Sequence, residues 1–429
     1  MRVSTNQASA TGGQTGAVRV LYCENNRDGT VGGSHYCLLH LVGGLDRGRF
    51  DPIVIFHERH PLVSRFEQNC PTLILPPPTT VPRRPGGSSI SEKLKTVRRF
   101  VAQIRERYRF LREHRIQLIN LNNSVTRQQD WMVAALMAGI PCLTHERGLN
   151  ARYSLLDRWL ARRLALVIPV SRWVRDHMVR GGIDPANLRV LYDGLNPGAV
   201  VPRRAAAAIR EEYGIRPGQP IVGIVGNVRT WKGQAVVIRA LIEVARTHPD
   251  VVCFVVGAST EADAAYMTML QDEITAAGIG AHVRFTGYQA DPASFMAAMQ
   301  FVLHASIEPE PYGMVLLEAM ALRKAVVASR AGGPVELVEE GVTGLTFPPG
   351  DAPALAQQIR TLLDDPPLAA RMGEAGRARL EREFSLDRYV ADVQEAYAAI
   401  LDGRPVPSHV GAQPTVSATS AGMSAGMSA

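Results

Sequence analysis

The feature of this chain that most constrains its fold is a series of short, unbroken apolar segments separated by longer stretches with helical periodicity. Strands covered on both faces of a parallel sheet have this continuous apolar pattern, because neither of their faces meets water. The expected strands are 18–23, 53–57, 116–121, 166–170 and 188–192, followed by 221–226, 251–257, 283–286, 301–304 and 325–329. The alternation predicts an α/β protein with two successive doubly wound, Rossmann-like domains.

The length of 429 residues suits two domains of this kind. A segment rich in proline and small residues, 195–209, separates the two series of strands and is the expected linker. We predict an N-terminal domain over 18–200, a C-terminal domain over 201–385, and a final helix over 386–403 that returns to the N-terminal domain. Two such domains are expected to face each other across a cleft that holds the ligand.

Composition excludes several classes of protein. The five cysteines include no closely spaced pair, so we expect buried free thiols in a reducing compartment, and neither disulfides nor a zinc site. No apolar run approaches the roughly 18 residues of a membrane span, and no secretory signal opens the chain. We therefore predict a cytoplasmic protein. The polar ends, 1–17 and 404–429, have too little apolar surface to offset their ordering entropy and are expected to be disordered.

The positive charge of the chain is concentrated in one segment. The net charge is +7, and residues 81–115 hold eleven Lys or Arg against three Glu, so the rest of the chain is about neutral. This distribution argues against a nucleic-acid binder with a basic surface all round, and it indicates one localised basic surface.

Residues suited to phosphate and ribose binding follow the fourth strand of the second series, in the segment SIEPEPYGMVLLEAMA (306–321). Its apolar residues have the spacing of a packed helix beginning near Gly313, so the free amides of Met314 and Val315 would face a ligand there. Oriented N–H groups and the helix dipole bind phosphate at such an N-terminus. Glu318, one turn further along, is placed to accept hydrogen bonds from two sugar hydroxyls, as carboxylates do with ribose.

A second motif, GNVRTWKG (226–233), ends the strand 221–226. Its two glycines suit a tight turn, and Arg229 and Lys232 supply positive charge for a diphosphate. Arg, Lys and helix N-termini can stabilise the negative charge of a diphosphate without a metal. Because no Asp-x-Asp pair occurs in a metal-binding setting, we expect no metal and no other cofactor.

The segments 306–321, 325–336 (AVVASRAGGPVE) and 341–350 (GVTGLTFPPG), with 221–233, resemble the retaining group 1 glycosyltransferases, glycosyltransferase family 4, of the GT-B architecture. The resemblance covers most of 221–400 with specific motifs and the first half of the chain more loosely. It implies a retaining hexosyltransferase that moves a sugar from a nucleotide-sugar donor to a glycan or lipid-linked acceptor, in cell-surface glycan or glycolipid synthesis. It also implies that the domain 18–200 is the acceptor side and the domain 201–385 the donor side.

The resemblance also implies roles for single residues. Glu318 would bind the donor ribose, Glu310 would lie beside the donor sugar and its diphosphate, and the amides at the helix start would hold the distal phosphate or sugar. Lys232 matches the family's lysine. Asn227 stands where the family usually has an arginine, and Arg229 is the expected replacement for that charge.

Three weaker candidates lie in the first half of the chain. Gly32 and Gly33 follow the first strand and would let the backbone approach the donor phosphate, although a simple loop competes with this interpretation. His145, in 141–148, follows a short strand at the carboxyl edge of the sheet, where ligands of open α/β sheets gather. The family often carries a histidine here, close to the donor sugar or the acceptor, whereas a lone histidine is more often a structural hydrogen-bonding residue.

The basic segment, 88–115, predicts an amphipathic helix. Its apolar stripe consists of Ile90, Leu94, Val97, Val101, Ile104, Tyr108 and Leu111. Three hypotheses fit: a stripe packed on the first domain with solvated charges, a seam for a partner helix, and reversible docking on an anionic membrane. The third would suit a lipid-linked acceptor and a peripheral location on the cytoplasmic membrane face.

Two other functions compete with sugar transfer. A nucleotide-sugar epimerase can use the same two-domain architecture and needs no acceptor, and a non-catalytic scaffold could retain the fold. Intact Glu310, Glu318 and Lys232 argue against the scaffold. A dehydrogenase is disfavoured because no Gly-x-Gly-x-x-Gly motif follows either first strand.

Overall fold

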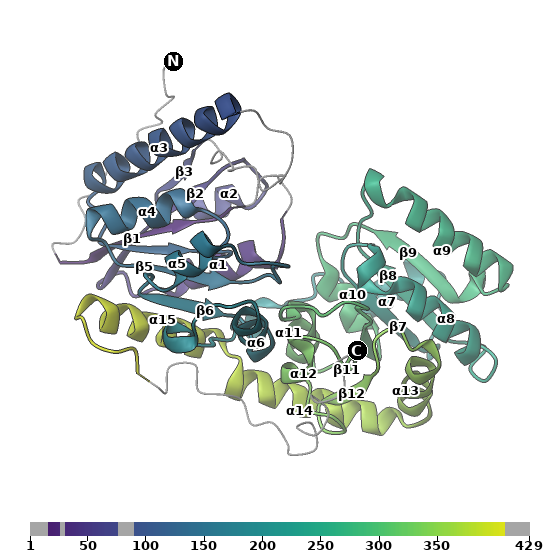
Figure 1. The fold of residues 1–429 in the computed structure, drawn as a ribbon. Coiled ribbons are helices and arrows are strands. Elements are labelled where there is room, and N and C mark those ends of the chain that lie inside the picture. The colour runs from purple at the N-terminus through teal and green to yellow at the C-terminus, as the bar shows by residue number, and fades with distance from the viewer. Residues whose placement is uncertain (1–15, 26–30, 76–89, 408–429) are drawn as a thin grey trace. The chain divides into compact units, whose positions relative to one another are not determined.

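A computed structural model describes residues 16–25, 31–75 and 90–407, which fall into two compact units (Figure 1). The first unit holds the described residues up to Val170, together with Val174–Tyr192 and the residues from Tyr389 onward. The second holds Ser171–Trp173 and Asp193–Arg388. Most of the two tails expected to be disordered, 1–17 and 404–429, lies outside the described residues.

The first unit is a parallel six-stranded sheet with the order β3-β2-β1-β4-β5-β6. Its strands are β1 (Val18–Cys23), β2 (Phe50–Phe56), β3 (Thr72–Ile74), β4 (Leu118–Leu121), β5 (Cys142–Glu146) and β6 (Leu166–Pro169). Its helices are α1 (Gly33–Gly44), α2 (Val63–Glu67), α3 (Ile90–Glu113), α4 (Gln129–Ala138), α5 (Leu155–Ala161), most of α6 (Arg172–Arg180) and most of α15 (Leu386–Leu401). The strand order reverses between β1 and β4, which makes that point the topological switch of this sheet.

The second unit repeats this plan, with the order β12-β11-β10-β7-β8-β9 and a switch between β10 and β7. Its strands are β7 (Ile221–Val225), β8 (Val252–Val256), β9 (Val283–Gly287), β10 (Phe301–His304), β11 (Ala325–Ser329) and β12 (Gly344–Phe347). Its helices are α7 (Ala206–Glu212), α8 (Gln234–Val244), α9 (Ala264–Ala276), α10 (Pro292–Ala298), α11 (Met314–Ala321), α12 (Pro334–Leu337), α13 (Ala352–Asp364) and α14 (Pro366–Glu383).

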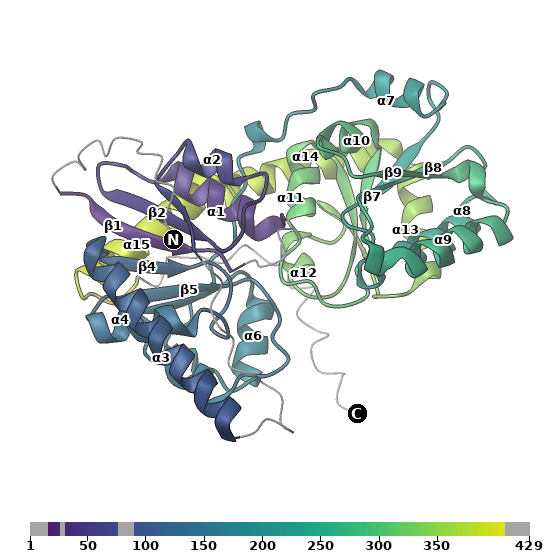
Figure 2. The ribbon, with the colours of Figure 1, turned by 90° about the horizontal axis from the view of Figure 1, so that it is seen from above.

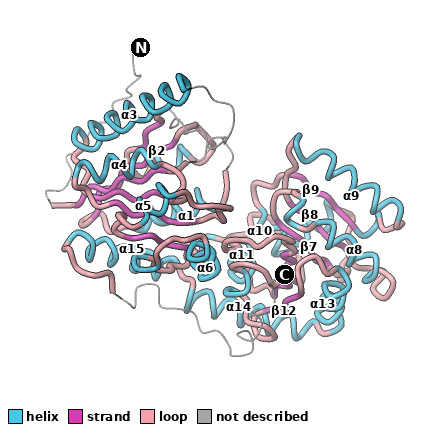
Figure 3. The backbone as a smooth tube through the Cα atoms, in the orientation of Figure 1, coloured by secondary structure: helices cyan, strands magenta, loops and turns pink. Residues whose placement is uncertain are grey.

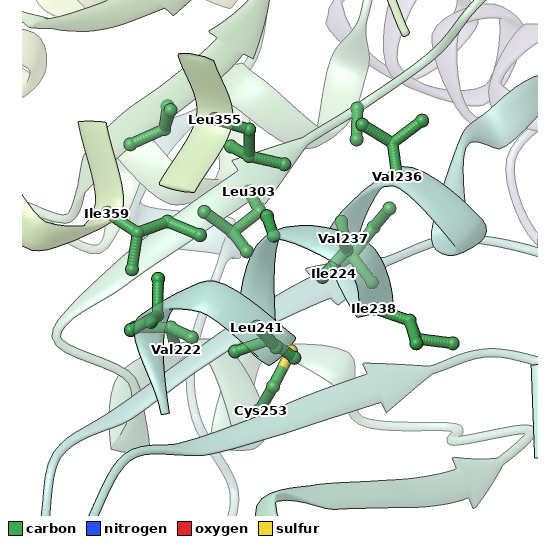
Figure 4. Packing of buried hydrophobic residues seen from close by; sticks show 14 of the residues in the cluster. Val222, Ile224, Val236, Val237, Ile238, Leu241, Cys253, Leu303, Leu355 and Ile359 are labelled. Carbon is green, nitrogen blue, oxygen red and sulfur yellow. The ribbon is translucent and has the colours of Figure 1, made fainter. Parts of the chain in front are cut away.

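Each sheet is a layer between helices, as the predicted α/β class requires (Figure 3). Right-handed connections place α1 and α2 on one face of the first sheet and α3, α4 and α5 on the other. In the second unit, Val222, Ile224 and Leu303 of the sheet pack with Leu241 of α8 and Leu355 of α13 (Figure 4). This burial of the strands explains their continuous apolar sequences. The prediction of two Rossmann-like α/β domains is confirmed.

Several strand predictions differ from the structure. The expected strand at 188–192 is wrong: it forms a single bridge, from Leu188 to Val167, and otherwise runs as an extended loop beside β6. β3 and β12 were not predicted, because β3 has three residues and β12 opens with Gly344. β5 was expected only as a short strand before His145, without stated bounds. A Cβ on Gly344 would lie 2.4 Å from the Val326 carbonyl oxygen, so a glycine there permits the strands to pair.

Two expectations from composition can be compared with the structure. The five cysteines are all buried and none forms a disulfide, as predicted. Within the ranges that the structure describes, no helix is both long and apolar enough to cross a membrane.

Candidate active site

Two loops meet at the switch point of the second unit. The loop 226–233 follows β7, and the loop 305–313 follows β10, which pairs directly with β7. Gly233 makes their close approach possible, since it has a φ of +74° and a Cβ there would lie 1.9 Å from the Ala305 carbonyl oxygen. The two motifs singled out in the sequence are therefore brought together at the carboxyl edge of the sheet, where open α/β sheets bind ligands.

Glu310 is the residue on which this site converges. Its Oε1 accepts a hydrogen bond from Lys232 Nζ at 2.8 Å, and its Oε2 lies 2.7 Å from His304 Nε2 and 2.9 Å from Ser306 Oγ. Burial alone would raise the pKa of Glu310, but the neighbouring His304 and Lys232 hold that pKa well below its usual range. Glu310 is thus a carboxylate at neutral pH, and both of its oxygens are engaged.

Lys232 is held in place by more than this ion pair. Its ammonium group lies 4.3 Å from the centre of the Trp231 ring, and its side chain is largely buried. The Trp231 carbonyl oxygen accepts a hydrogen bond from Ile307 N–H, which joins the two loops a second time. The site therefore holds a fixed ammonium group beside an ionised carboxylate.

The loop that contains Glu310 lies against the backbone of two glycines in the segment 331–336. Gly333 N–H donates to the Glu310 carbonyl oxygen at 2.7 Å. A Cβ on Gly332 would lie 2.2 Å from that same oxygen, and one on Gly333 would lie 2.4 Å from the Pro311 carbonyl oxygen. The Glu336 carboxylate accepts hydrogen bonds from the backbone N–H groups of Arg172 and Trp173, at the start of α6.

Helix α11 begins directly after this loop. Gly313 is its N-cap residue, with a φ of +108°, and Met314 and Val315 are the first two residues of the helix. Among the described residues, no group accepts a hydrogen bond from the N–H of Met314 or Val315. These amides are therefore available to an anion, as expected from the sequence.

Glu318 lies one turn into α11 and is only half-buried. In the part of the chain that the structure describes, its carboxyl group has neither a hydrogen bond nor an ion pair. Burial raises its pKa to about 7. A carboxyl group in this state gains most from a ligand that donates hydrogen bonds to its ionised form.

Arg229 and Asn227 occupy the loop after β7 but do not contact Glu310. The Arg229 Nε atom is buried and has no hydrogen-bond partner among the described residues, whereas Asn227 is exposed. The Asn227 carbonyl oxygen accepts from Gln234 Nε2 at 3.1 Å, which ties the loop to the start of α8. Arg229 therefore retains an unused donor beside the site.

The first unit contains the three weaker candidates. His145 lies inside β5 instead of after it, and it is fully buried. Its Nδ1 lies 3.0 Å from Asn120 Oδ1, and its Nε2 lies 3.0 Å from the Tyr389 hydroxyl. Burial, followed by the nearby Arg147 charge, holds the pKa of His145 well below its ordinary value, so the ring is neutral. Both ring nitrogens bind protein groups, and His145 joins the sheet to α15.

Gly32 and Gly33 lie at the start of α1, as N-cap and first helical residue. A Cβ on Gly32 would meet no atom within 4 Å, so the surrounding protein does not require glycine there. Beside them, at the switch point of this sheet, the Glu24 carboxylate accepts hydrogen bonds from the side-chain amides of Asn122 and Asn123.

Sequence reasoning missed two residues that contact Glu310 and one at the first switch point. His304 ends β10, Ser306 follows two residues later, and Glu24 follows β1. For His304 and Glu24 the available signal was a polar residue directly at the end of an apolar strand, and Ser306 lies within the loop that follows such a strand. Among the described residues, no group of three His, Cys, Asp or Glu side chains is placed to hold a metal ion.

The raised pKa of Glu318 predicts a pH-dependent effect of the substitution Glu318→Gln. Between the ordinary value of 4.5 and about 7, the folded protein binds a proton that the unfolded chain has released, so wild-type stability falls as pH rises through this window. The glutamine side chain of the variant does not titrate, so the stability of the variant does not fall in this way. The free energy of unfolding in urea is therefore expected to be higher for Glu318→Gln than for wild type, by a difference that grows with pH up to about 3 kcal/mol. Glu308→Gln, at an exposed position, is the matched control. A constant difference between Glu318→Gln and wild type from pH 4.5 to 7.5 would contradict the assignment.

Both halves of the chain match known protein families. Residues 206–379 match the family described as Glycosyl transferases group 1, and residues 31–198 match Glycosyltransferase Family 4. Over 250 residues the chain is 31% identical to the lipopolysaccharide core biosynthesis mannosyltransferase LpcC of Rhizobium leguminosarum bv. viciae, a stretch covering 58% of this chain and 69% of that protein.

A second relative is the GDP-mannose-dependent alpha-(1-6)-phosphatidylinositol monomannoside mannosyltransferase of Mycolicibacterium smegmatis. The chain is 34% identical to it over 245 residues, covering 55% of this chain and 61% of that protein. The matched stretch thus spans between 61% and 69% of these two relatives.

Solved structures show the same architecture. The crystal structure of Anabaena HepE in complex with UDP and glucose has a TM-score of 0.74 at 25% identity, covering 89% of this chain and 100% of that chain. A glycosyltransferase of Rickettsia africae ESF-5 has a TM-score of 0.77 at 20% identity, covering 90% and 99%, which shows the fold alone. With its two parallel sheets of the GT-B type and a family match in each half, the chain belongs to the group 1 glycosyltransferases and carries a glycosyltransferase family 4 domain as its first half.

Proposed function

We propose that this protein is a retaining glycosyltransferase that moves a hexose from a nucleoside diphosphate donor to a hydroxyl group of a glycan or lipid-linked acceptor. The observation that carries the proposal is the Lys232–Glu310 pair beside the free N-terminus of α11. A donor of this kind needs stabilised negative charge on its leaving diphosphate, and this edge of the second sheet holds the groups that supply it.

Lys232 and the N–H groups of Met314 and Val315 are the proposed diphosphate ligands. As the bond between the sugar C1 and the phosphate oxygen breaks, their positive charge offsets the charge that develops on the diphosphate. Glu310 contacts the Lys232 ammonium group at 2.8 Å and so holds it in place beside the proposed diphosphate. Arg229, whose Nε bonds to no group in the described part of the chain, is the proposed second cation.

Retention fits attack on the same face of the sugar from which the diphosphate departs. In that step the acceptor oxygen bonds to C1, the C1–phosphate bond breaks, and the departing phosphate oxygen takes the acceptor's proton. Glu310 does not serve as the acid, because its pKa is held well below its usual range. Its proposed task is to position the donor sugar and Lys232.

Glu318 is the proposed anchor for the donor ribose, whose two hydroxyls would donate to the otherwise unpartnered carboxyl group. The relatives support a nucleoside diphosphate donor without choosing its base. The Anabaena protein was crystallised with UDP, and the Mycolicibacterium relative is named as GDP-mannose-dependent. The names of the relatives also suggest acceptors in lipopolysaccharide core or phosphatidylinositol mannoside synthesis, and so a place of action at the cytoplasmic membrane face.

Replacing Lys232 by Ala or Glu310 by Gln is expected to lower turnover by about 10²–10³. The first change removes the ammonium group that stabilises the leaving diphosphate, and the second removes the carboxylate that holds this ammonium group in place. The assay is nucleoside diphosphate release from a panel of nucleotide sugars, with circular dichroism to check the fold. Arg371→Ala, an exposed change on α14, is the control. Near-wild-type turnover of Lys232→Ala would contradict the diphosphate assignment, and donor conversion without any acceptor would identify an epimerase instead.

Transfer is expected to continue after a chelator is added, because Lys232 and the amides at the start of α11 supply the charge stabilisation that a metal would otherwise provide. Turnover is measured before and after dialysis against EDTA, and again after adding manganese or magnesium. An enzyme that EDTA silences and manganese restores would show that this part of the proposal is wrong.

A further inference from the structure

Helix α3 is packed against the first unit along its second half only. Ile104 and Leu111 are buried there, and the buried Arg107 donates to Asp130 at 3.2 Å and lies 4.9 Å from the centre of the Trp131 ring. Asp130 and Trp131 belong to the first turn of α4. The second half of the predicted apolar stripe is thus used in folding.

The first half of the same stripe is exposed. Leu94, Val97 and Val101 are 51%, 55% and 40% exposed, although they continue the helical spacing of the buried residues. Leu94 precedes Arg107 by thirteen residues, about 20 Å of helix at about 1.5 Å per residue. This half of α3 therefore extends past the start of α4, as Figures 1 and 2 show. No described part of the first unit covers its apolar side.

Basic side chains flank this exposed stripe. Lys95, Arg98, Arg99 and Arg105 are all exposed. Within the described part of the chain, none of them forms an ion pair or a hydrogen bond with an acidic side chain. Their charge is uncompensated by the protein, so it is available to an anionic partner.

A second exposed apolar group lies at the start of α5. Leu155 is 82% exposed and Trp159 is 44% exposed, and Arg163 lies 4.0 Å from the centre of the Trp159 ring. Gln129, the first residue of α4, donates to Asp157 of α5 at 2.5 Å, so this turn also lies at the end of the layer where α4 begins. Tryptophan with neighbouring arginine is typical of residues at a membrane–water interface.

We propose that the first half of α3 and the exposed Leu155 and Trp159 of α5 form one docking face for an anionic lipid bilayer. The face rests on the proposed function, because it would bring the acceptor-side unit to a lipid-linked acceptor. Apolar side chains that enter the interface and basic residues that meet lipid phosphates together distinguish a bilayer from other anionic surfaces. A second copy of the chain would place like charges against each other, which disfavours self-association through this face.

The test is flotation of the full-length protein with vesicles of phosphatidylcholine alone or mixed with phosphatidylglycerol, at low and high salt. Wild type should bind the mixed vesicles at low salt, and binding should weaken as salt screens the charges. Reversing Lys95, Arg98 and Arg99 to Glu should weaken binding about a hundredfold, since each basic residue near the surface contributes about 1 kcal/mol. Leu155→Gln with Trp159→Gln should weaken it about tenfold.

The matched control reverses the same number of charges in the second unit, as Arg203→Glu, Arg371→Glu and Arg382→Glu, at exposed positions. These changes should alter binding only a few-fold. Equal losses in the control and the α3 variant, or equal wild-type binding to both vesicle types, would overturn the docking face. A concentration-dependent dimer that the α3 variant abolishes would show a protein partner instead.

Nucleotide binding separates this inference from the proposed function. All of these variants leave the second-unit site intact, so UDP or GDP should raise their thermal midpoints as it raises that of wild type. Loss of vesicle binding with intact nucleotide stabilisation supports the docking face. Vesicle binding by a wild-type protein that neither nucleotide stabilises would leave the docking face in place and contradict the proposed function.

Discussion

The ion pair between Lys232 and Glu310 is the interaction on which the organisation of the second unit's site depends. It joins the loop after β7 to the loop after β10, the two strands at which the sheet reverses its order. Breaking such a pair inside a protein leaves a charge without compensation, which costs more than the pair itself contributes. His304 and Ser306 take the second oxygen of Glu310, so the carboxylate is fixed from both sides. The rigid carboxylate in turn fixes where positive charge faces the ligand.

Around that pair, the backbone is as important as the side chains. Gly233 and Gly332 permit contacts in which a Cβ would lie 1.9 and 2.2 Å from carbonyl oxygens. These approaches bring the loop that leads into α11 against the loop that contains Lys232. The proposed chemistry follows from this arrangement: one fixed cation and a helix N-terminus for a diphosphate, with Glu318 further along the helix for a sugar hydroxyl pair.

Much of this could be predicted from the sequence, and the reasons for the remainder are physical. Continuous apolar strands predict parallel sheets, and the Rossmann strand order then brings the ends of β7 and β10 together. The role of His145 could not be found in this way, because its partner Tyr389 is 244 residues away and belongs to the last helix. Likewise, the apolar stripe of α3 has one uniform pattern, but only the half beside α4 is covered. Which half is buried depends on how far the neighbouring helix α4 extends, and the periodicity of the α3 sequence gives no information about that.

The measurement that tests the central claim most directly is the pKa of Glu318. It is determined from the NMR signal of the Glu318 carboxyl carbon during a pH titration, with and without saturating UDP or GDP. Burial sets this pKa at about 7 in the free protein. If the second unit holds the nucleotide as proposed, hydrogen bonds from the ribose hydroxyls favour the ionised carboxylate, and the pKa should fall clearly below its value in the free protein. A Glu318 titration that neither nucleotide changes, under conditions in which binding is shown by calorimetry, would contradict the account.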